Sequence, residues 1–233
     1  MIKKNICIIP ARGGSKRIPK KNIRNFFGKP IVVYSIEAAL ESGLFDEVMV
    51  STDSQEIAEI AIKNKAKVPF LRSIKNSNDF ASTADVVEEV LLEYKKVDRE
   101  FKYVCCLYPT APFVTSSRLK ESVELLENSD VESVIPITSF NYPIQRSFKI
   151  NNDGKVAMFY PENINIRSQD LPPAYHDCGQ FYCLNVDNFL INKKIYTEDA
   201  LPMIIPEYEV QDIDNEEDWQ MAELKYKLLH KIT

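Results

Sequence analysis

The fold is decided early, by the stretch Ile8-Ile9-Pro10-Ala11-Arg12-Gly13-Gly14-Ser15-Lys16-Arg17-Ile18-Pro19-Lys20-Lys21-Asn22, in which an apolar strand runs into a long basic loop. Two adjacent glycines let the backbone turn tightly and bring N–H groups within reach of phosphate oxygens. The arginine and lysine side chains supply the opposite charge, and no acidic residue precedes Glu37. Because α/β sheets bind ligands outside the carboxyl ends of their strands, the stretch predicts a polyphosphate site, most simply for a nucleotide triphosphate.

Length and composition predict a single domain of residues 1–233. The chain has 233 residues, 45% of them hydrophobic, which suffices for one core of ordinary size. A net charge of -5 argues against a nucleic-acid partner, which would require a basic face. The charge is uneven, however, with bases at 3–29 and acids at 207–218. We expect triphosphate at the first and a divalent metal at the second, the alternative for each being a solvated surface.

The sequence shows no apolar run of signal-peptide length, nor the roughly 20 apolar residues that cross a bilayer. We therefore expect a cytoplasmic protein with no membrane partner. The five cysteines form no CxxC or His-containing spacing, so we expect buried free thiols rather than a zinc site.

Strand and helix patterns alternate along most of the chain, which predicts a three-layer α/β/α sandwich with a mainly parallel sheet. Strands are expected at 6–9, 48–51, 103–107, 131–137 and 179–184, with a last apolar stretch at 202–205. Helices are expected at 30–40, 116–127 and 186–191, from about 216, and after caps at Asp53 or Ser54 and at Thr83. Pro30 should be the first residue of its helix, which should end near Gly43.

The alternation breaks down between Thr138 and Asp177, where prolines divide the sequence into short pieces. Asn152-Asp153-Gly154 predicts a hairpin turn between the segments 148–150 and 156–159. We interpret 138–177 as an arm inserted into the domain.

Two standard nucleotide motifs are absent. Pro30 follows Gly28-Lys29, which excludes a P-loop, and Gly13-Gly14 does not begin a GxGxxG pattern. The site prediction depends instead on the bases that follow the first strand, namely Arg12, Lys16, Arg17, Lys20 and Lys21. Arg72 and Ser82-Thr83 should lie near the same sheet edge, the latter at a helix N-terminus that favours anions.

Asp212 and Asp214 flank Ile213, so both carboxylates point to one side of an extended segment. Two oxygen ligands suit Mg²⁺ carried on triphosphate oxygens, because this ion keeps several waters. The alternative is a helix cap, since carboxylates are also favoured at the start of the helix that follows. His176 has no Ser or Cys nucleophile around it, so we interpret it as a substrate contact or loop residue rather than a general base.

Three segments together resemble the CMP-nonulosonate synthetases, the family that includes CMP-sialic acid synthetase: residues 10–22, Tyr108-Pro109-Thr110-Ala111-Pro112 and Gln211-Asp212-Ile213-Asp214. The resemblance covers essentially the whole chain. It implies transfer of CMP from CTP to the anomeric hydroxyl of an acidic nine-carbon sugar, with release of pyrophosphate, for surface glycan or flagellin glycosylation. It also implies Mg²⁺ as cofactor and a homodimer in which the arm 138–177 reaches across to the partner.

Site roles follow from the same resemblance. The implied catalytic residues are Arg12, Lys16, Lys21 and Asp212, with Asp212 and Asp214 on the metal. The implied nucleotide contacts are Ala11, Arg12, Gly13, Ser15, Lys21, Asn22, Arg72, Ser82, Pro109 and Thr110. The expected sugar contacts are Tyr108, Gln145, Arg146, Arg167, Tyr175, Gln180 and Phe181.

Family members that activate sialate typically have Gln where this chain has Tyr108 and Gly where it has Arg17. Both departures count against N-acetylneuraminate as the substrate. Arg17, together with 142–146 and 171–182, resembles members that activate pseudaminic acid. The alternatives are legionaminate, N-acetylneuraminate and the eight-carbon Kdo. A metal-dependent glycosyltransferase also uses a DxD sequence such as 212–214, although only a helix follows here, and a non-catalytic nucleotide-sugar-binding module is the third possibility.

Overall fold

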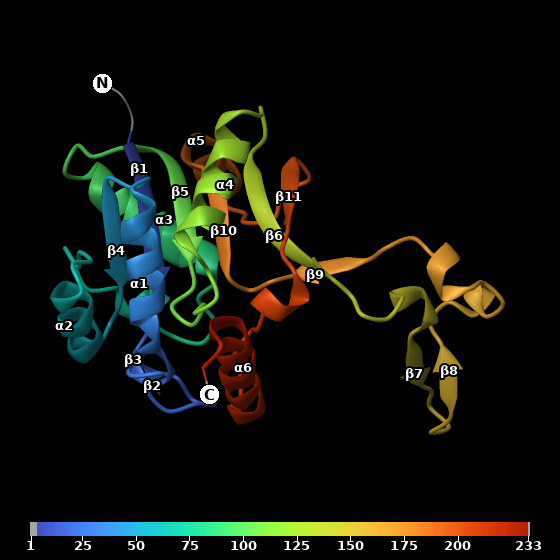
Figure 1. Ribbon diagram of the computed structural model, residues 1–233. Coiled ribbons are helices and arrows are strands. Elements are labelled where there is room, and N and C mark those ends of the chain that lie inside the picture. The colour runs from blue at the N-terminus through green and yellow to red at the C-terminus, as the bar shows by residue number, and fades with distance from the viewer. Residues whose placement is uncertain (1–3, 233) are drawn as a thin grey trace.

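The computed structural model describes residues 4–232 and has a central seven-stranded sheet (Figure 1). The strands are β1 (Lys4–Pro10), β4 (Glu47–Ser51), β5 (Phe101–Leu107), β6 (Ser133–Ser139), β9 (Tyr175–Asp177), β10 (Phe181–Asn185) and β11 (Ala200–Ile204). Their order is β11-β6-β10-β5-β1-β4, with β9 also paired to β6. Strands β9 and β10 run against the direction of the other five, which confirms the predicted mainly parallel sheet.

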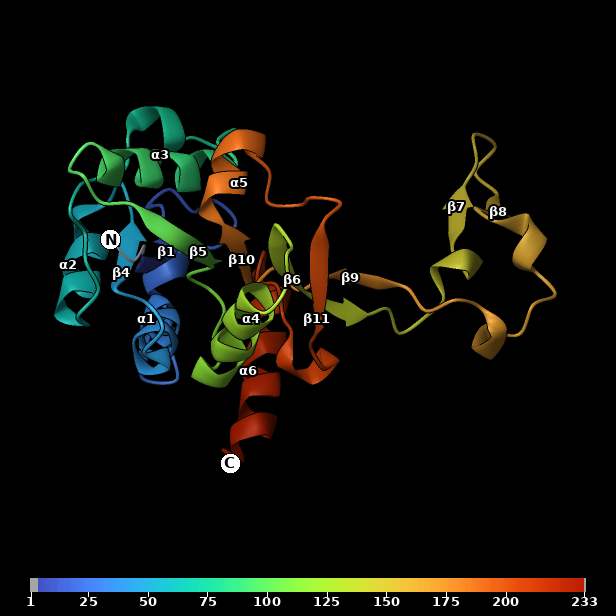
Figure 2. The same cartoon turned by 90° about the horizontal axis from the view of Figure 1, so that it is seen from above.

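Helices cover both faces of the sheet, as Figure 2 shows from above. On one face lie α1 (Ile31–Ser42), α2 (Gln55–Lys63) and α4 (Ser116–Glu127), and on the other α3 (Thr83–Lys95) and α5 (Val186–Asn192). Side chains alternate along β1, so that Cys7 and Ile9 join the first core while Ile6 and Ile8 join the second. The predicted three-layer sandwich is confirmed.

Side-chain caps fix where α2 and α3 begin. Ser54 caps α2, as the sequence allowed. The prediction that Pro30 is the first residue of α1 is wrong by one residue: the helix begins at Ile31, after Pro30. It ends at Ser42, next to Gly43, whose φ is 66°. The prediction that Thr83 caps α3 is wrong by one residue. Ser82 accepts a hydrogen bond from the Asp85 backbone, and the Asp85 carboxylate accepts one from the Ser82 backbone, so this reciprocal pair sets the start.

The helix α6 (Glu216–His230) packs against a small hairpin formed by β2 (Asn25–Phe26) and β3 (Lys29–Pro30). The rings of Phe26 and Trp219 meet edge to face with centroids 5.6 Å apart. Ile18 of the basic loop and Ile213 of the acidic segment are buried in the same cluster. This packing brings oppositely charged segments from the two ends of the fold together.

The segment between β6 and β9 extends away from the main body as an arm (Figure 1). Within it, β7 (Phe148–Ile150) and β8 (Val156–Met158) form the predicted hairpin, with Gly154 at a φ of 73°. At the base of the arm, Thr138 pairs with His176, which lengthens the central sheet. Single helical turns complete the structure, at Lys21–Ile23, Ile74–Asn76, Ile144–Arg146, Pro161–Asn163, Ser168–Asp170 and Glu207–Glu209.

Candidate active site

A cavity of about 300 Å³ lies at the carboxyl ends of β1 and β5, where the basic loop, the start of α3 and the acidic segment meet. The predicted site residues on its wall are Arg12, Ser15, Lys16, Lys21, Asn22, Arg72, Ser82, Tyr108, Pro109, Thr110, Asp212 and Asp214. Arg17 and Thr83 also line it, as do Pro10, Ile18, Ala81 and Val86, which the sequence did not single out. Side chains from five separate parts of the chain therefore converge on one cavity.

Lys21 links the basic loop to the acidic segment. Its Nζ donates a hydrogen bond to the carbonyl oxygen of Ile213 at 2.5 Å and lies 3.7 Å from the carboxylate of Asp214. Burial lowers the pKa of Lys21, and the neighbouring Asp214 and Asp212 carboxylates partly offset that effect. Arg17 pairs with the same Asp214 carboxylate at 2.7 Å.

The carboxylates of Asp212 and Asp214 face the same cavity, as their alternation around buried Ile213 predicted. Burial, followed by the charge of Asp214, raises the pKa of Asp212. Within residues 4–232 there is no group of three or more His, Cys, Asp or Glu side chains suited to hold a metal. An ion bound here would complete its coordination with phosphate oxygens and water, which is how Mg²⁺ usually binds. The carboxylate pair fits that ion.

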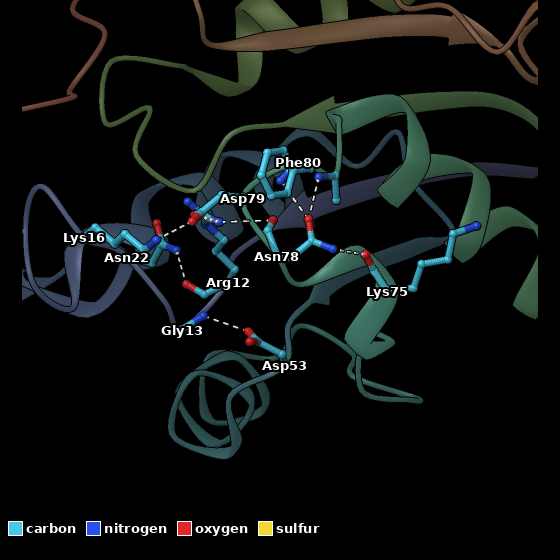
Figure 3. Close-up of polar contacts among 10 residues, drawn as sticks. Arg12, Gly13, Lys16, Asn22, Asp53, Lys75, Asn78, Asp79 and Phe80 are labelled. Atoms are coloured by element: carbon cyan, nitrogen blue, oxygen red, sulfur yellow. Dashed lines mark hydrogen bonds and ion pairs between the residues drawn. The ribbon is translucent and has the colours of Figure 1, made fainter.

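Arg12 and Lys16 converge on Asp79, which lies in the loop before α3 (Figure 3). Arg12 reaches one carboxylate oxygen at 2.7 Å and also donates to the carbonyl of Asn78, whereas Lys16 bonds the other oxygen. Hydrogen bonds from Lys16 and Arg12 lower the pKa of Asp79. No sequence pattern marks Asp79, because only the fold brings it opposite the basic loop.

Hydrogen bonds from Gly13 and Asn22 fix the shape of the glycine turn. The Gly13 N–H, which the sequence offered to phosphate, donates to the Asp53 carboxylate at 2.7 Å (Figure 3). Asn22 is buried and donates from its side-chain amide to the carbonyl of Arg12 at 2.8 Å. Ala11 is buried in the core. The loop is thus shaped by contacts within itself and with Asp53.

Arg72 and Tyr108 form the wall opposite the basic loop. Arg72 is almost fully buried and donates from Nε to the hydroxyl of Ser51 at 3.0 Å. Burial lowers the pKa of Arg72. The hydroxyl of Tyr108 lies 3.0 Å from that of Thr83, and burial raises the pKa of Tyr108.

The expected sugar contacts are dispersed. Tyr108 faces the cavity, but Phe181 is buried in the core and Gln180 is 2% exposed. The other four belong to the arm or its base: Gln145, Arg146, Arg167 and Tyr175. There, Gln145 donates to the carbonyl of Pro172 and Arg146 to that of Ile166, both at 3.0 Å. The single chain therefore does not bring the arm residues to the cavity wall.

The sequence matches known proteins that share one enzyme class. Residues 6–229 match the family model described as Cytidylyltransferase. Over 228 residues, and 98% of each chain, the sequence is 43% identical to a pseudaminic acid cytidylyltransferase of Campylobacter jejuni subsp. jejuni serotype O:2. It is 34% identical over 227 residues, and 94% of each chain, to a CMP-N,N'-diacetyllegionaminic acid synthase of Legionella pneumophila.

A solved structure of CMP:2-keto-3-deoxy-manno-octonic acid synthetase complexed with CTP shares the fold. Its TM-score is 0.70 at 16% identity, over 98% of this chain and 100% of that one. The chain belongs to the cytidylyltransferase family and is a CTP-dependent nucleotidyltransferase. The resemblance drawn from the sequence motifs is confirmed. The glycosyltransferase and non-catalytic alternatives are not supported.

Among residues 4–232, every helix is too short or too polar to span a bilayer.

Proposed function

We propose that this enzyme transfers CMP from CTP to the anomeric hydroxyl of pseudaminic acid, giving CMP-pseudaminic acid and pyrophosphate. The observation that carries the choice of sugar is the 43% identity, over nearly the full length of both chains, to the Campylobacter enzyme. The cavity is consistent with it. Tyr108 and Arg17, the two positions that depart from the sialate-activating pattern, both lie on its wall.

The arrangement of charges supports an in-line substitution at the α-phosphorus. Both substrates are anions, so their approach requires cations, and Arg12, Lys16 and Lys21 are grouped on one wall of the cavity. Such reactions are catalysed chiefly by positioning and by neutralising developing charge. Asp212 and Asp214 would hold Mg²⁺, which supplies further neutralisation of phosphate oxygens. Asn22 stabilises the loop that presents these groups, through its bond to the Arg12 carbonyl.

The arm supports a homodimer. It exposes large apolar side chains: Tyr142, Phe148, Ile150, Val156, Phe159, Tyr160 and Ile164. Many large apolar side chains exposed on one short segment are typical of a protein interface. We propose that a second copy covers it and that Gln145, Arg146, Arg167 and Tyr175 approach the partner's sugar site. Since the reaction consumes CTP, we also propose that it takes place in the cytoplasm.

The test is pyrophosphate release from CTP and Mg²⁺ with pseudaminate, legionaminate, N-acetylneuraminate and Kdo, assayed separately. We expect a strong preference for pseudaminate. Preference for another sugar would support the proposed cytidylyl transfer but contradict pseudaminate as the substrate. The similarity to the Legionella relative makes legionaminate the next candidate. Sedimentation of the intact protein tests the dimer, and a monomer at micromolar concentration would contradict it.

A further inference from the structure

The turn before β10 lies directly behind the Asp212 carboxylate. Gly179 has a φ of 61°, in the left-handed region that favours glycine. A Cβ built on Gly179 would be 3.2 Å from Cγ and 3.3 Å from Oδ2 of Asp212. Such contacts are tighter than most Cβ atoms make, so a side chain at this position would press on the carboxylate, and the glycine leaves room for it.

The next residue supports the same segment from inside. Gln180 is 2% exposed and donates from Nε2 to the carbonyl oxygen of Glu209 at 2.7 Å. Its own carbonyl accepts the backbone N–H of Tyr108 at 2.8 Å. Gln180 thereby joins the end of β5, which carries Tyr108, to the acidic segment.

Two cations hold that segment on its other sides. Lys225 of α6 donates to the carbonyl of Val210 at 2.6 Å, and Arg118 of α4 pairs with the Glu209 carboxylate at 3.2 Å. These contacts restrain residues 209 and 210, whereas the carboxylate of Asp212 meets Gly179. The backbone path and the carboxylate position therefore have separate supports.

From this geometry we infer that Gly179 and Gln180 are positioning residues for Asp212: the first leaves space for its carboxylate, and the second fixes the backbone that leads to it. The inference rests on the proposed catalytic role of Asp212. Gln180 then acts through Asp212 rather than through contact with the sugar. A displaced carboxylate would hold the ion and the α-phosphate out of line, so turnover should suffer more than CTP binding.

The central test is Gly179→Ala, with Gly43→Ala as the matched control. Gly43 has a similar φ of 66° but no atom within 4 Å of a built Cβ, so it reproduces the backbone strain without the contact. We expect Gly179→Ala to lower kcat about 10- to 100-fold relative to Gly43→Ala, with KM for CTP changed less than about threefold. Mn²⁺ binding in the presence of a non-hydrolysable CTP analogue, followed by electron paramagnetic resonance, should weaken about tenfold. Equal kcat and equal Mn²⁺ affinity in the two variants would overturn the inference.

Thermal unfolding gives a readout that needs no turnover. In Asp212→Ala the crowded Cγ and Oδ2 are gone, so adding Gly179→Ala should lower Tm less than it does in the wild type. An undiminished loss would show that Gly179 does not act through Asp212. For Gln180, the near-isosteric Gln180→Met should lower kcat and weaken Mn²⁺ binding in the same direction, and wild-type values would remove it from the inference. Failure of the chain to use pseudaminate would leave the Tm and Mn²⁺ results interpretable.

Discussion

Lys21 donates its side-chain hydrogen bond to the carbonyl oxygen of Ile213, so the basic loop is joined directly to the segment that bears the two carboxylates. The half-buried ammonium group is therefore fixed beside the acidic segment, and it also lines the cavity. A lysine on an open surface would have neither the fixed position nor the lowered pKa that burial gives Lys21.

Replacing this group should abolish activity. We expect Lys21→Ala to lower kcat at least about 100-fold, because a preorganised cation is lost from the site where charge develops. Lys20→Ala is the matched control, since the adjacent Lys20 pairs with Glu56 on the surface and should keep its turnover. We expect Asp212→Ala to be near-inactive as well. Pyrophosphate release measures the effect and circular dichroism checks folding; wild-type-like turnover by either variant would remove its assigned role.

Arg17 should tune the metal requirement. Its guanidinium pairs with Asp214 at 2.7 Å, so it competes with a cation for the same carboxylate. We expect Arg17→Met to lower the Mg²⁺ concentration for half-maximal rate about two- to tenfold, since an exposed ion pair is worth little and is readily exchanged. The measurement is a Mg²⁺ titration at fixed ionic strength. A higher Mg²⁺ requirement in the variant would show that Arg17 supports the metal instead.

Asp79 should oppose triphosphate binding. Its carboxylate occupies Arg12 and Lys16 together, and a triphosphate must take over both cations. We expect Asp79→Asn to bind CTP a few-fold more tightly at low salt, with the gain shrinking as salt rises. Calorimetry in 50 and 300 mM salt, about twofold apart in screening length, measures this. The control is Glu93→Gln, which breaks the surface pair between Glu93 of α3 and Lys96, the residue just after that helix. Weaker CTP binding by Asp79→Asn alone would show that Asp79 supports binding.

The cysteines should be unreactive in the folded protein. All five are free and buried, and burial raises the pKa of Cys106 and of Cys178 to about 12. At pH 8 these thiols stay protonated, so Ellman's reagent should label them quickly only after unfolding. Because the folded pKa exceeds the ordinary thiol value of 9.0, the unfolding free energy should fall as pH rises above 9.0. Rapid labelling of native protein would contradict the buried arrangement.

Local patterns were enough to predict most of the fold. The helix expected at 116–127 is α4 to the residue, because a threonine cap and a clear apolar stripe define it. The strand at 103–107 was evident as a continuous apolar run, which reflects burial on both faces of the sheet. Strand β9 was missed, since Tyr175–Asp177 is short and depends on pairing with β6 rather than on its own composition.

The site was predictable where charge or spacing carried the signal, as in the basic loop and the Asp212–Asp214 pair. The role of a residue was not predictable where it depends on the direction in which the side chain points. Phe181 sits in the core because the pleat of β10 turns its side chain toward that face, and Gln180 is buried against Glu209. Asp79 meets Arg12 only through the folding of intervening strands. A contact between residues far apart in the sequence leaves no local pattern, whereas the residues of a short motif can be recognised together.

The packing of α6 against the β2–β3 hairpin also has a consequence for protein synthesis. A nascent chain acquires the basic loop early, but it has no carboxylate pair until residues 212–214 leave the ribosome. Trp219 must follow before it can pack against Phe26. A chain that ends within the arm would carry the basic loop but lack Asp212 and Asp214. If the proposed role of the carboxylate pair holds, we expect a chain that ends before the last helix to have no activity.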